Sequence, residues 1–338
     1  MGRLLLRVFL ASCIVAAVAV VVAVIELVWY LFTLIPGRVV DPPALLSITQ
    51  GDPSLLVYFA LYFFVVIPLA AIAFLVHGAI RRDRLRKNGV PAVAPPVIRD
   101  HPYTVAVLTA YNDEASIGLA VNEFRQIRCI DQVVVVDNNC VDRTAEVARE
   151  AGATVIPEAQ QGYGFACMRG LRYALESTPA DRIVLAEGDM TFFSNDTEKL
   201  LPYLADCDLV IGTRTTRTLT RDGSQMDWFM AWGNMFLASL IRMRYWDPVF
   251  MGQARLTDVG CTFRAMRREP LQKIIDQLTV GGNYFSPHMI LVALQNQMRV
   301  VEVPIKFRKR VGVSKGAGGD RQRAIGIGLQ MLAEITFH

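Results

Sequence analysis

Two long apolar runs open the hydrophobic pattern of the chain, and each is long enough to cross a lipid bilayer. Residues 8–35 carry a single charge, Glu26, and residues 55–80 carry none of Asp, Glu, Lys or Arg. A bilayer core of roughly 30 Å needs about 20 helical residues, so the pattern predicts one transmembrane helix in each run. A cleavable signal peptide would have a shorter apolar region and would leave the second run unexplained. We therefore expect residues 1–87 to form a two-helix membrane anchor.

From residue 103 the pattern changes to short apolar runs that alternate with longer mixed segments. The apolar runs at 104–109, 132–136, 154–156 and 182–186 predict strands, and the segments 115–127, 142–151 and 165–176 predict helices. Continuous Val/Ile/Leu runs separated by helices are typical of parallel strands covered on both faces. We therefore predict an α/β fold with a mostly parallel, Rossmann-like sheet over residues 103–338. The proline-rich residues 88–102 are expected to be a linker.

The distribution of charge predicts the orientation of the anchor. Residues 1–100 hold nine Lys/Arg and five Asp/Glu, which accounts for the whole net charge of +4. The basic residues precede the first run and follow the second, whereas residues 36–54 contain only Arg38. The positive-inside rule then places both termini and the globular domain in the cytoplasm, at the inner membrane of the cell. A nucleic-acid-binding protein would carry its basic patch on the folded domain, so this class is excluded.

Cysteine and histidine spacing gives no sign of a metal centre. The six cysteines are scattered without a C-x-x-C pair, and the four histidines lie far from one another in the sequence. This pattern fits reduced cytosolic thiols and argues against a zinc site.

Polar residues follow three of the predicted strands, at 111–113, 137–139 and 187–189. In a parallel sheet these positions meet at one edge, where ligands bind, so we expect a single pocket there. Glu187 and Asp189 could hold a hard divalent cation, since Mg²⁺ takes one or two carboxylates beside substrate phosphates. Residues 161–164 (QGYG) precede a helix, and free N–H groups there could meet a phosphate or a sugar. P-loop, dinucleotide-binding and G-x-S-x-G motifs are absent from the sequence.

Several ordered motifs resemble family 2 glycosyltransferases with the GT-A fold. They are the segments 107–113 (VLTAYND), 135–144 (VVDNNCVDRT), 161–166 (QGYGFA) and 187–191 (EGDMT). Three later segments are similar to the dolichyl-phosphate mannose synthase-like subgroup, which glycosylates polyprenyl phosphates: 258–268 (DVGCTFRAMRR), 301–304 (VEVP) and 310–315 (RVGVSK). The resemblance covers about residues 103–338.

The resemblance also implies roles for individual residues. It implies that the nucleotide and sugar of a donor are held by a set of pocket residues: Tyr111, Asp113, Val135, Asp137, Gly162, Glu187, Gly188, Asp189, Arg214 and Lys315. It implies that Glu187, Asp189 and Thr191 bind Mg²⁺ or Mn²⁺, and that Arg310 and Lys315 form a basic clamp for phosphates. Glu187 and Thr191 depart from the usual D-x-D-x-Q pattern, which leaves the donor and the preferred metal open.

The implied reaction is transfer of a sugar, with inversion, from a nucleotide diphosphate to a polyprenyl phosphate at the inner leaflet. Asp258, Asp189 and Arg310 are the candidate catalytic residues, with Asp258 on the acceptor side in catalysis or positioning. A hydroxyl acceptor, with Asp258 as general base, is one alternative, because a hydroxyl needs a base and a phosphate does not. A non-catalytic nucleotide-sugar-binding protein is another. A processive polysaccharide synthase would show Q-x-x-R-W, which the sequence lacks.

Two amphipathic segments complete the expected domain. Residues 226–246 place Trp, Phe and Met on recurring helical faces, and residues 321–338 follow Arg321 and Arg323 with regularly spaced apolar positions. We expect both to be interfacial helices beside the acceptor. The sugar, the base, the lipid length and whether the protein is a homo-oligomer stay open.

Overall fold

The computed structural model describes residues 101–224, 226–245, 255–312 and 321–338. The chain divides into two compact units, 1–92 and 93–338. The predicted membrane hairpin at 8–35 and 55–80, the linker up to residue 100 and Lys315 lie outside the described residues.

None of the helices in the described ranges is both long and apolar enough to span a bilayer.

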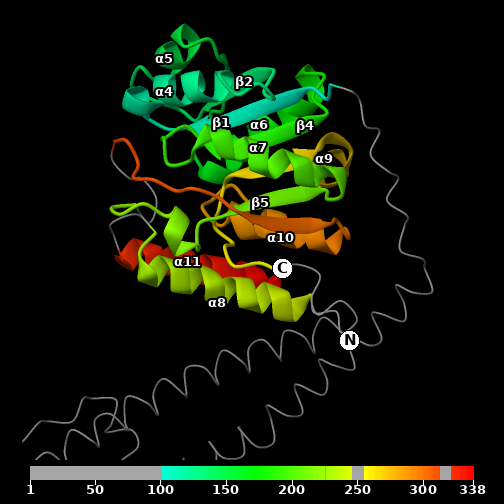
Figure 1. Cartoon of the computed structure of the whole chain (residues 1–338). Coiled ribbons are helices and arrows are strands. Elements are labelled where there is room, and N and C mark those ends of the chain that lie inside the picture. The colour runs from blue at the N-terminus through cyan, green and yellow to red at the C-terminus, as the bar shows by residue number, and fades with distance from the viewer. Residues whose placement is uncertain (1–100, 225, 246–254, 313–320) are drawn as a thin grey trace, which may run out of the picture. The chain divides into compact units, whose positions relative to one another are not determined.

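The described part of unit 93–338 is built on a seven-stranded sheet with the order β3-β2-β1-β4-β6-β5-β7 (Figure 1). All neighbouring pairs are parallel except those of β6, which runs antiparallel to β4 and β5. The prediction of a mostly parallel α/β sheet is therefore confirmed. The strands are β1 (Thr104–Ala110), β2 (Gln132–Asp137), β3 (Thr154–Pro157), β4 (Arg182–Glu187), β5 (Leu209–Thr213), β6 (Arg264–Arg267) and β7 (Val300–Pro304).

The sequence gives no strand signal for β6, because its four residues RAMR form no apolar run. All four side chains are nonetheless buried, since the strand lies between β4 and β5 in the middle of the sheet. Arg264 is fully buried and donates from Nε to the carbonyl oxygen of Cys261, 2.9 Å away.

Helices cover the sheet and connect its parallel strands. The helices are α4 (Glu114–Arg125), α5 (Thr144–Glu150), α6 (Tyr163–Ser177), α7 (Thr197–Leu200), α8 (Trp228–Arg244), α9 (Arg268–Ile274), α10 (Phe285–Gln295) and α11 (Arg321–Phe337). Short 3₁₀ segments cover Ser194–Asp196, Leu201–Ala205, Arg217–Leu219 and Ile275–Gln277.

The packing of α6 depends on a glycine. An added Cβ at Gly170 would come within 2.3 Å of the Val107 side chain on β1 and 2.8 Å of that of Val136 on β2. This close approach holds α6 against the strands, so that its N-terminus lies beside their carboxyl ends. The polar residues that follow β1, β2 and β4 are thereby gathered next to α6.

Helices α8 and α11 lie side by side below the sheet in Figure 1, and α11 also packs against α10. Asp227 begins α8 by accepting a hydrogen bond at Oδ1 from the Met230 N–H, at 2.8 Å. The predicted segments 226–246 and 321–338 are therefore helical over Trp228–Arg244 and Arg321–Phe337.

Candidate active site

A cavity of about 450 Å³ opens where the carboxyl ends of β1 and β4 face α8 and α11. One wall is polar and carries the residues that follow the strands, among them Asp113, Glu187 and Asp189. The opposite wall is apolar and comes from α8 and α11. The expectation of one shared pocket at the strand ends is thus confirmed, because residues from all three segments, 111–113, 137–139 and 187–189, line it.

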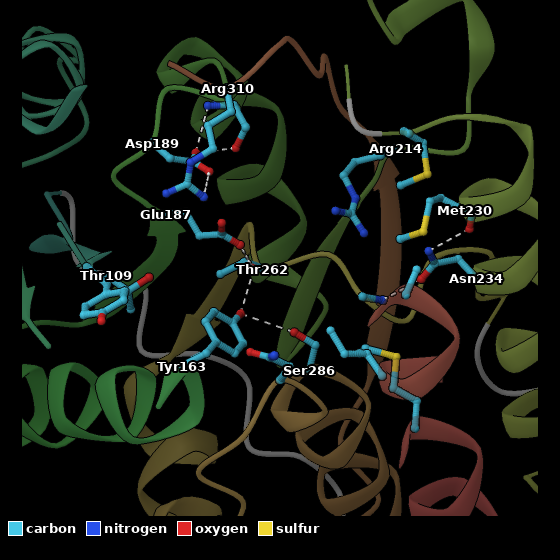
Figure 2. A pocket seen from close by; sticks show the side chains of 18 of the residues that line it. Thr109, Tyr163, Glu187, Asp189, Arg214, Met230, Asn234, Thr262, Ser286 and Arg310 are labelled. Carbon is cyan, nitrogen blue, oxygen red and sulfur yellow. Dashed lines mark hydrogen bonds and ion pairs between the residues drawn. The ribbon is translucent and has the colours of Figure 1, made fainter. Parts of the chain in front are cut away.

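Arg310 links two carboxylates of the polar wall. Its guanidinium lies 2.6 Å from Oδ1 of Asp113 and 3.0 Å from Oδ2 of Asp189, and Figure 2 shows the contact with Asp189. The other oxygen of Asp189 accepts from the hydroxyl of Thr191, at 2.5 Å, and from its N–H, at 2.9 Å. Asp189 is therefore held in one orientation from both sides.

Glu187 points into the same cavity and has an unusual pKa. Burial, together with the nearby charge of Asp189, raises the pKa of its carboxyl to about 7. Its Oε1 accepts a hydrogen bond from Thr262, at 2.6 Å, and Thr262 in turn lies 2.6 Å from the hydroxyl of Tyr163. Tyr163 also lies 3.3 Å from Ser286 Oγ (Figure 2). This hydrogen-bonded chain fixes one oxygen of Glu187.

Arg214 faces the cavity from the end of β5 and is positioned by Asp258. Its Nε and Nη2 each lie 2.8 Å from a different oxygen of Asp258, and its N–H donates to Oδ2 at 3.0 Å. Asp258 is fully buried, and its own N–H donates to Oε1 of Glu302 on β7, at 2.8 Å. A two-bond ion pair of this kind fixes both the charge and the plane of the guanidinium.

The apolar wall carries methionine, phenylalanine and isoleucine side chains. Met230 and Leu237 of α8 and Ile327 and Met331 of α11 line it, and Asn234 lies among them (Figure 2). Gly233 and Gly328 also line this wall, and a Cβ added at either would meet no atom within 4 Å. The cavity therefore has free space beside both helices.

The structure brings together most of the residues implied by the resemblance. The cavity is lined by Tyr111, Asp113, Gly162, Glu187, Asp189, Thr191, Arg214 and Arg310. Gly188 lies behind the wall, where an added Cβ would meet Ile117 at 2.4 Å. Asp258 does not line the cavity and reaches it through Arg214.

Two of the implied residues on β2 do not reach the cavity. Val135 is fully buried inside the sheet, where it pairs with Leu108 and Val155. Asp137 accepts a hydrogen bond at Oδ1 from the Cys140 N–H, at 3.0 Å, which closes the turn after β2. Asn138, the next residue, lines the cavity instead.

The expectation that residues 161–164 offer free N–H groups is wrong at two positions. The N–H of Gly162 donates to Oδ1 of Asn138, at 3.0 Å, and that of Gly164 donates to the carbonyl oxygen of Gly281, at 2.8 Å. Gly164 can approach the backbone this closely because it lacks a side chain: an added Cβ would lie 2.0 Å from the Val280 oxygen.

Sequence reasoning missed the residues that support the site from behind. Thr262 lies within the segment 258–268, and Glu302 lies within 301–304, so both were inside recognised motifs. Their roles depend on pairs far apart in the chain, such as Thr262 with Glu187 and Glu302 with Asp258. Tyr163 lies within the recognised segment 161–164, whereas Ser286 and Asn234 belong to no recognised motif.

The carboxylates of the polar wall suit a hard divalent cation. Glu187 and Asp189 provide the carboxylate oxygens that Mg²⁺ and Mn²⁺ prefer. The guanidinium of Arg310 already lies beside Asp189, which shows that the carboxylates stabilise positive charge at this position. The hydroxyl of Thr191 donates to Asp189 and helps to orient its carboxylate.

The family model described as "Glycosyl transferase family 2" matches residues 105–275. The dolichyl-phosphate hexose transferase of Haloferax volcanii is 29% identical over 210 residues, which cover 62% of this chain and 84% of that protein. The polyprenol monophosphomannose synthase of Mycolicibacterium smegmatis is 26% identical over 68% of this chain and 87% of its own length. The low-salt glycan biosynthesis hexosyltransferase Agl6 of Haloferax volcanii is 28% identical over 62% of this chain, which spans only 49% of that relative.

Among solved structures, glucosyl-3-phosphoglycerate synthase from Mycobacterium tuberculosis has a similar fold. The TM-score is 0.52 at 17% identity, over 69% of this chain and 77% of that one. That structure contains Mn²⁺, uridine diphosphate and phosphoglyceric acid. The likeness supports the expected GT-A-like fold of the described domain.

Proposed function

Since this chain belongs to glycosyltransferase family 2, we propose that it is an inverting enzyme with a nucleotide-sugar donor and a polyprenyl-phosphate acceptor. The observation that carries the proposal is the division of one cavity into two walls. Carboxylates and Arg310 gather on one wall, the side chains of α8 and α11 make the other apolar, and Arg214 lines the cavity near α8 (Figure 2). A charged donor and a lipid acceptor need these two environments side by side.

The donor is assigned to the polar wall. Tyr111 and Asp113 lie at the end of β1, where a base and ribose would fit. A divalent cation held by Glu187 and Asp189 would supply positive charge beside the leaving diphosphate. The Mn²⁺ and uridine diphosphate in the structure of the mycobacterial synthase support this assignment by analogy.

The acceptor is assigned to the apolar wall, with its phosphate directed at the arginines. The names of two relatives, a dolichyl-phosphate hexose transferase and a polyprenol monophosphomannose synthase, support a lipid phosphate. The bonding of Asp258 supports it as well. Both of its oxygens accept from Arg214, and the side chain is fully buried, so it is poorly placed to take a proton from a hydroxyl.

In the proposed step, an oxygen of the acceptor phosphate attacks the anomeric carbon from the side opposite the diphosphate. A new carbon–oxygen bond forms as the bond to the diphosphate breaks, and the configuration inverts. The phosphate is already anionic, so the step requires no proton removal. Arg214 and Arg310 are the cations on the cavity wall that would stabilise charge on the two phosphate groups.

We also propose that α8 and α11 contact the inner leaflet of the membrane. Trp228, Trp232 and Met235 of α8 are exposed, as are Ile325 and Leu329 of α11. The rings of Trp232 and Phe236 are stacked, with centroids 5.6 Å apart. Exposed aromatic and aliphatic side chains on neighbouring helices suit the headgroup region of a bilayer, which would bring the lipid to the cavity.

The direct test of this function is transfer of label from nucleotide sugars to polyprenyl phosphate by the full chain in detergent, with Mg²⁺ or Mn²⁺. We expect labelled lipid from the wild type and loss of the product with a chelator. Asp189→Asn should abolish transfer and the metal-dependent part of donor affinity, because the diphosphate would lose its bridging cation. His101→Ala, an exposed change outside the cavity, is the control. Donor binding without turnover under all conditions would instead indicate a nucleotide-sugar-binding protein.

A further inference from the structure

Three potential metal ligands meet at the contact between α10 and α11. His288 comes from α10, and Glu334 and His338 come from the end of α11. The Nδ1 atoms of His288 and His338 lie 2.8 Å and 2.9 Å from the same oxygen, Oε1 of Glu334. One possible ligand atom from each residue lies within 4.8 Å of the others. None of the three residues lines the cavity described above.

The donor set is the one that zinc sites use. Two imidazoles and one carboxylate bind Zn²⁺ at about 2.0–2.2 Å and leave a fourth position for water. His338 directly follows α11, and its N–H donates to the carbonyl oxygen of Glu334, at 3.0 Å, so that the two side chains lie one helical turn apart on the same face. The hydrogen bonds from His288 and His338 lower the pKa of Glu334 to about 2, so its carboxylate is ionised near neutral pH.

His288 also has the support that a metal-bound histidine needs. Its side chain is almost fully buried, and its Nε2 lies 3.2 Å from the backbone nitrogen of Thr279 and 3.3 Å from the carbonyl oxygen of Gln277. A histidine that binds a metal through one ring nitrogen usually donates the other N–H to a carbonyl or carboxylate. In the structure Nε2 accepts from the Thr279 N–H and Nδ1 faces Glu334; a cation on Nδ1 would move the ring proton to Nε2, which also faces the Gln277 carbonyl oxygen.

We propose that His288, Glu334 and His338 bind one divalent transition-metal cation, with Zn²⁺ as the best match. The cation replaces the two hydrogen bonds to Glu334 with coordinate bonds and ties the last turn of α11 to α10. The preceding turns of α11 carry Ile327 and Met331, which line the apolar wall of the cavity. The bound cation thereby fixes the position of that wall. This inference does not depend on the proposed reaction.

The site was not detectable in the sequence. His288 and Glu334 are 46 residues apart, and neither belongs to a spaced metal-binding motif. The histidines are isolated in the sequence, which is why it predicts no zinc site, and they come together only in the fold.

The test is a calorimetric Zn²⁺ titration of the full chain in detergent. Excess Mg²⁺ is present, and the protein carries the background change Asp189→Asn, which removes one of the two donor-side carboxylates. We expect one Zn²⁺ per chain and a Zn²⁺-dependent rise in the thermal midpoint. His338→Ala should lower the affinity at least about 100-fold, because loss of even an outer partner costs 10–100-fold. Glu334→Gln should also weaken binding, and His101→Ala, outside the cluster, should not.

Co²⁺ in place of Zn²⁺ distinguishes metal binding at this site from binding by cysteines. Tetrahedral nitrogen and oxygen ligands give visible absorption bands without the charge-transfer bands of a thiolate ligand. The proposal is overturned if the background variant binds no Zn²⁺ at the protein concentration used. It is also overturned if His338→Ala and Glu334→Gln bind as tightly as the background, or if Co²⁺ shows thiolate ligation. His338 is partly exposed, so its replacement leaves the core intact.

Discussion

Three carboxylates and one guanidinium share the polar wall of the cavity. Arg310 bridges Asp113 and Asp189, while Glu187 has no such partner and accepts a hydrogen bond from Thr262. Burial and the neighbouring charge of Asp189 raise the pKa of Glu187, and the charges of Arg310 and Arg214 offset this only in part. A cation bound beside Glu187 and Asp189 would provide the missing positive charge.

The pKa of Glu187 leads to a testable pH dependence. Its value of about 7 lies above the ordinary carboxyl value, so the group is protonated at lower pH and must lose that proton before it can bind a cation. The affinity of the donor site for Mn²⁺ should therefore rise as the pH rises toward that value, by up to about tenfold per pH unit. Paramagnetic resonance of Mn²⁺ in the presence of donor measures this affinity.

Glu187→Gln is the matched variant for that measurement. It cannot ionise, so its weaker Mn²⁺ affinity should stay constant over the same pH range. Should the wild type be equally insensitive to pH, Glu187 is not a ligand that titrates near neutral pH.

At the scale of secondary-structure elements, helices α8 and α11 shape the side of the cavity that is assigned to the acceptor. Gly328 of α11 lines the apolar wall, and an added Cβ there meets no atom within 4 Å. Gly326, two residues earlier, is exposed and does not line the cavity. The two glycines therefore differ in the direction that a new side chain would take.

Gly328→Leu should fill the acceptor side of the cavity without disturbing the donor side. We expect the KM for polyprenyl phosphate to rise roughly ten- to a hundredfold, which corresponds to about 1–3 kcal/mol of overpacking. The affinity for the nucleotide sugar should stay unchanged. Gly326→Leu, in the same helix, is the control and should behave as the wild type. Equal KM values for Gly328→Leu and Gly326→Leu would show that the lipid acceptor does not bind along this wall.

The elements that sequence could predict are those with a local signal. The strands β1, β2, β3 and β4 are apolar runs, and the segment 226–246 has an amphipathic period, so each was foreseen within a few residues. Strand β6 was not, because the residues of Arg264–Arg267 become buried only through pairing with β4 and β5. The same holds for the link of Asp258 to Arg214, which joins residues 44 positions apart.

At the scale of the whole molecule, the remaining prediction concerns the membrane hairpin at 8–35 and 55–80. A Ser47→Cys change in the loop 36–54 should react with an impermeant thiol reagent on intact cells, whereas Asn88→Cys in the linker should react only after lysis. External labelling at position 88 would reverse the predicted orientation.

One comparison of two acceptors tests both the glycosyltransferase activity and the chemical nature of the acceptor. The full chain in detergent is given one nucleotide sugar and equal amounts of a polyprenyl phosphate and the polyprenol of the same length, and the products are identified by mass spectrometry. The account predicts a glycosylated phosphate and little or no glycosylated alcohol, because the alcohol needs a base and both oxygens of Asp258, the candidate base, accept from Arg214. Equal glycosylation of the alcohol, with Asp258→Asn inactive on it, would contradict the lipid-phosphate acceptor and identify a hydroxyl acceptor with Asp258 as base.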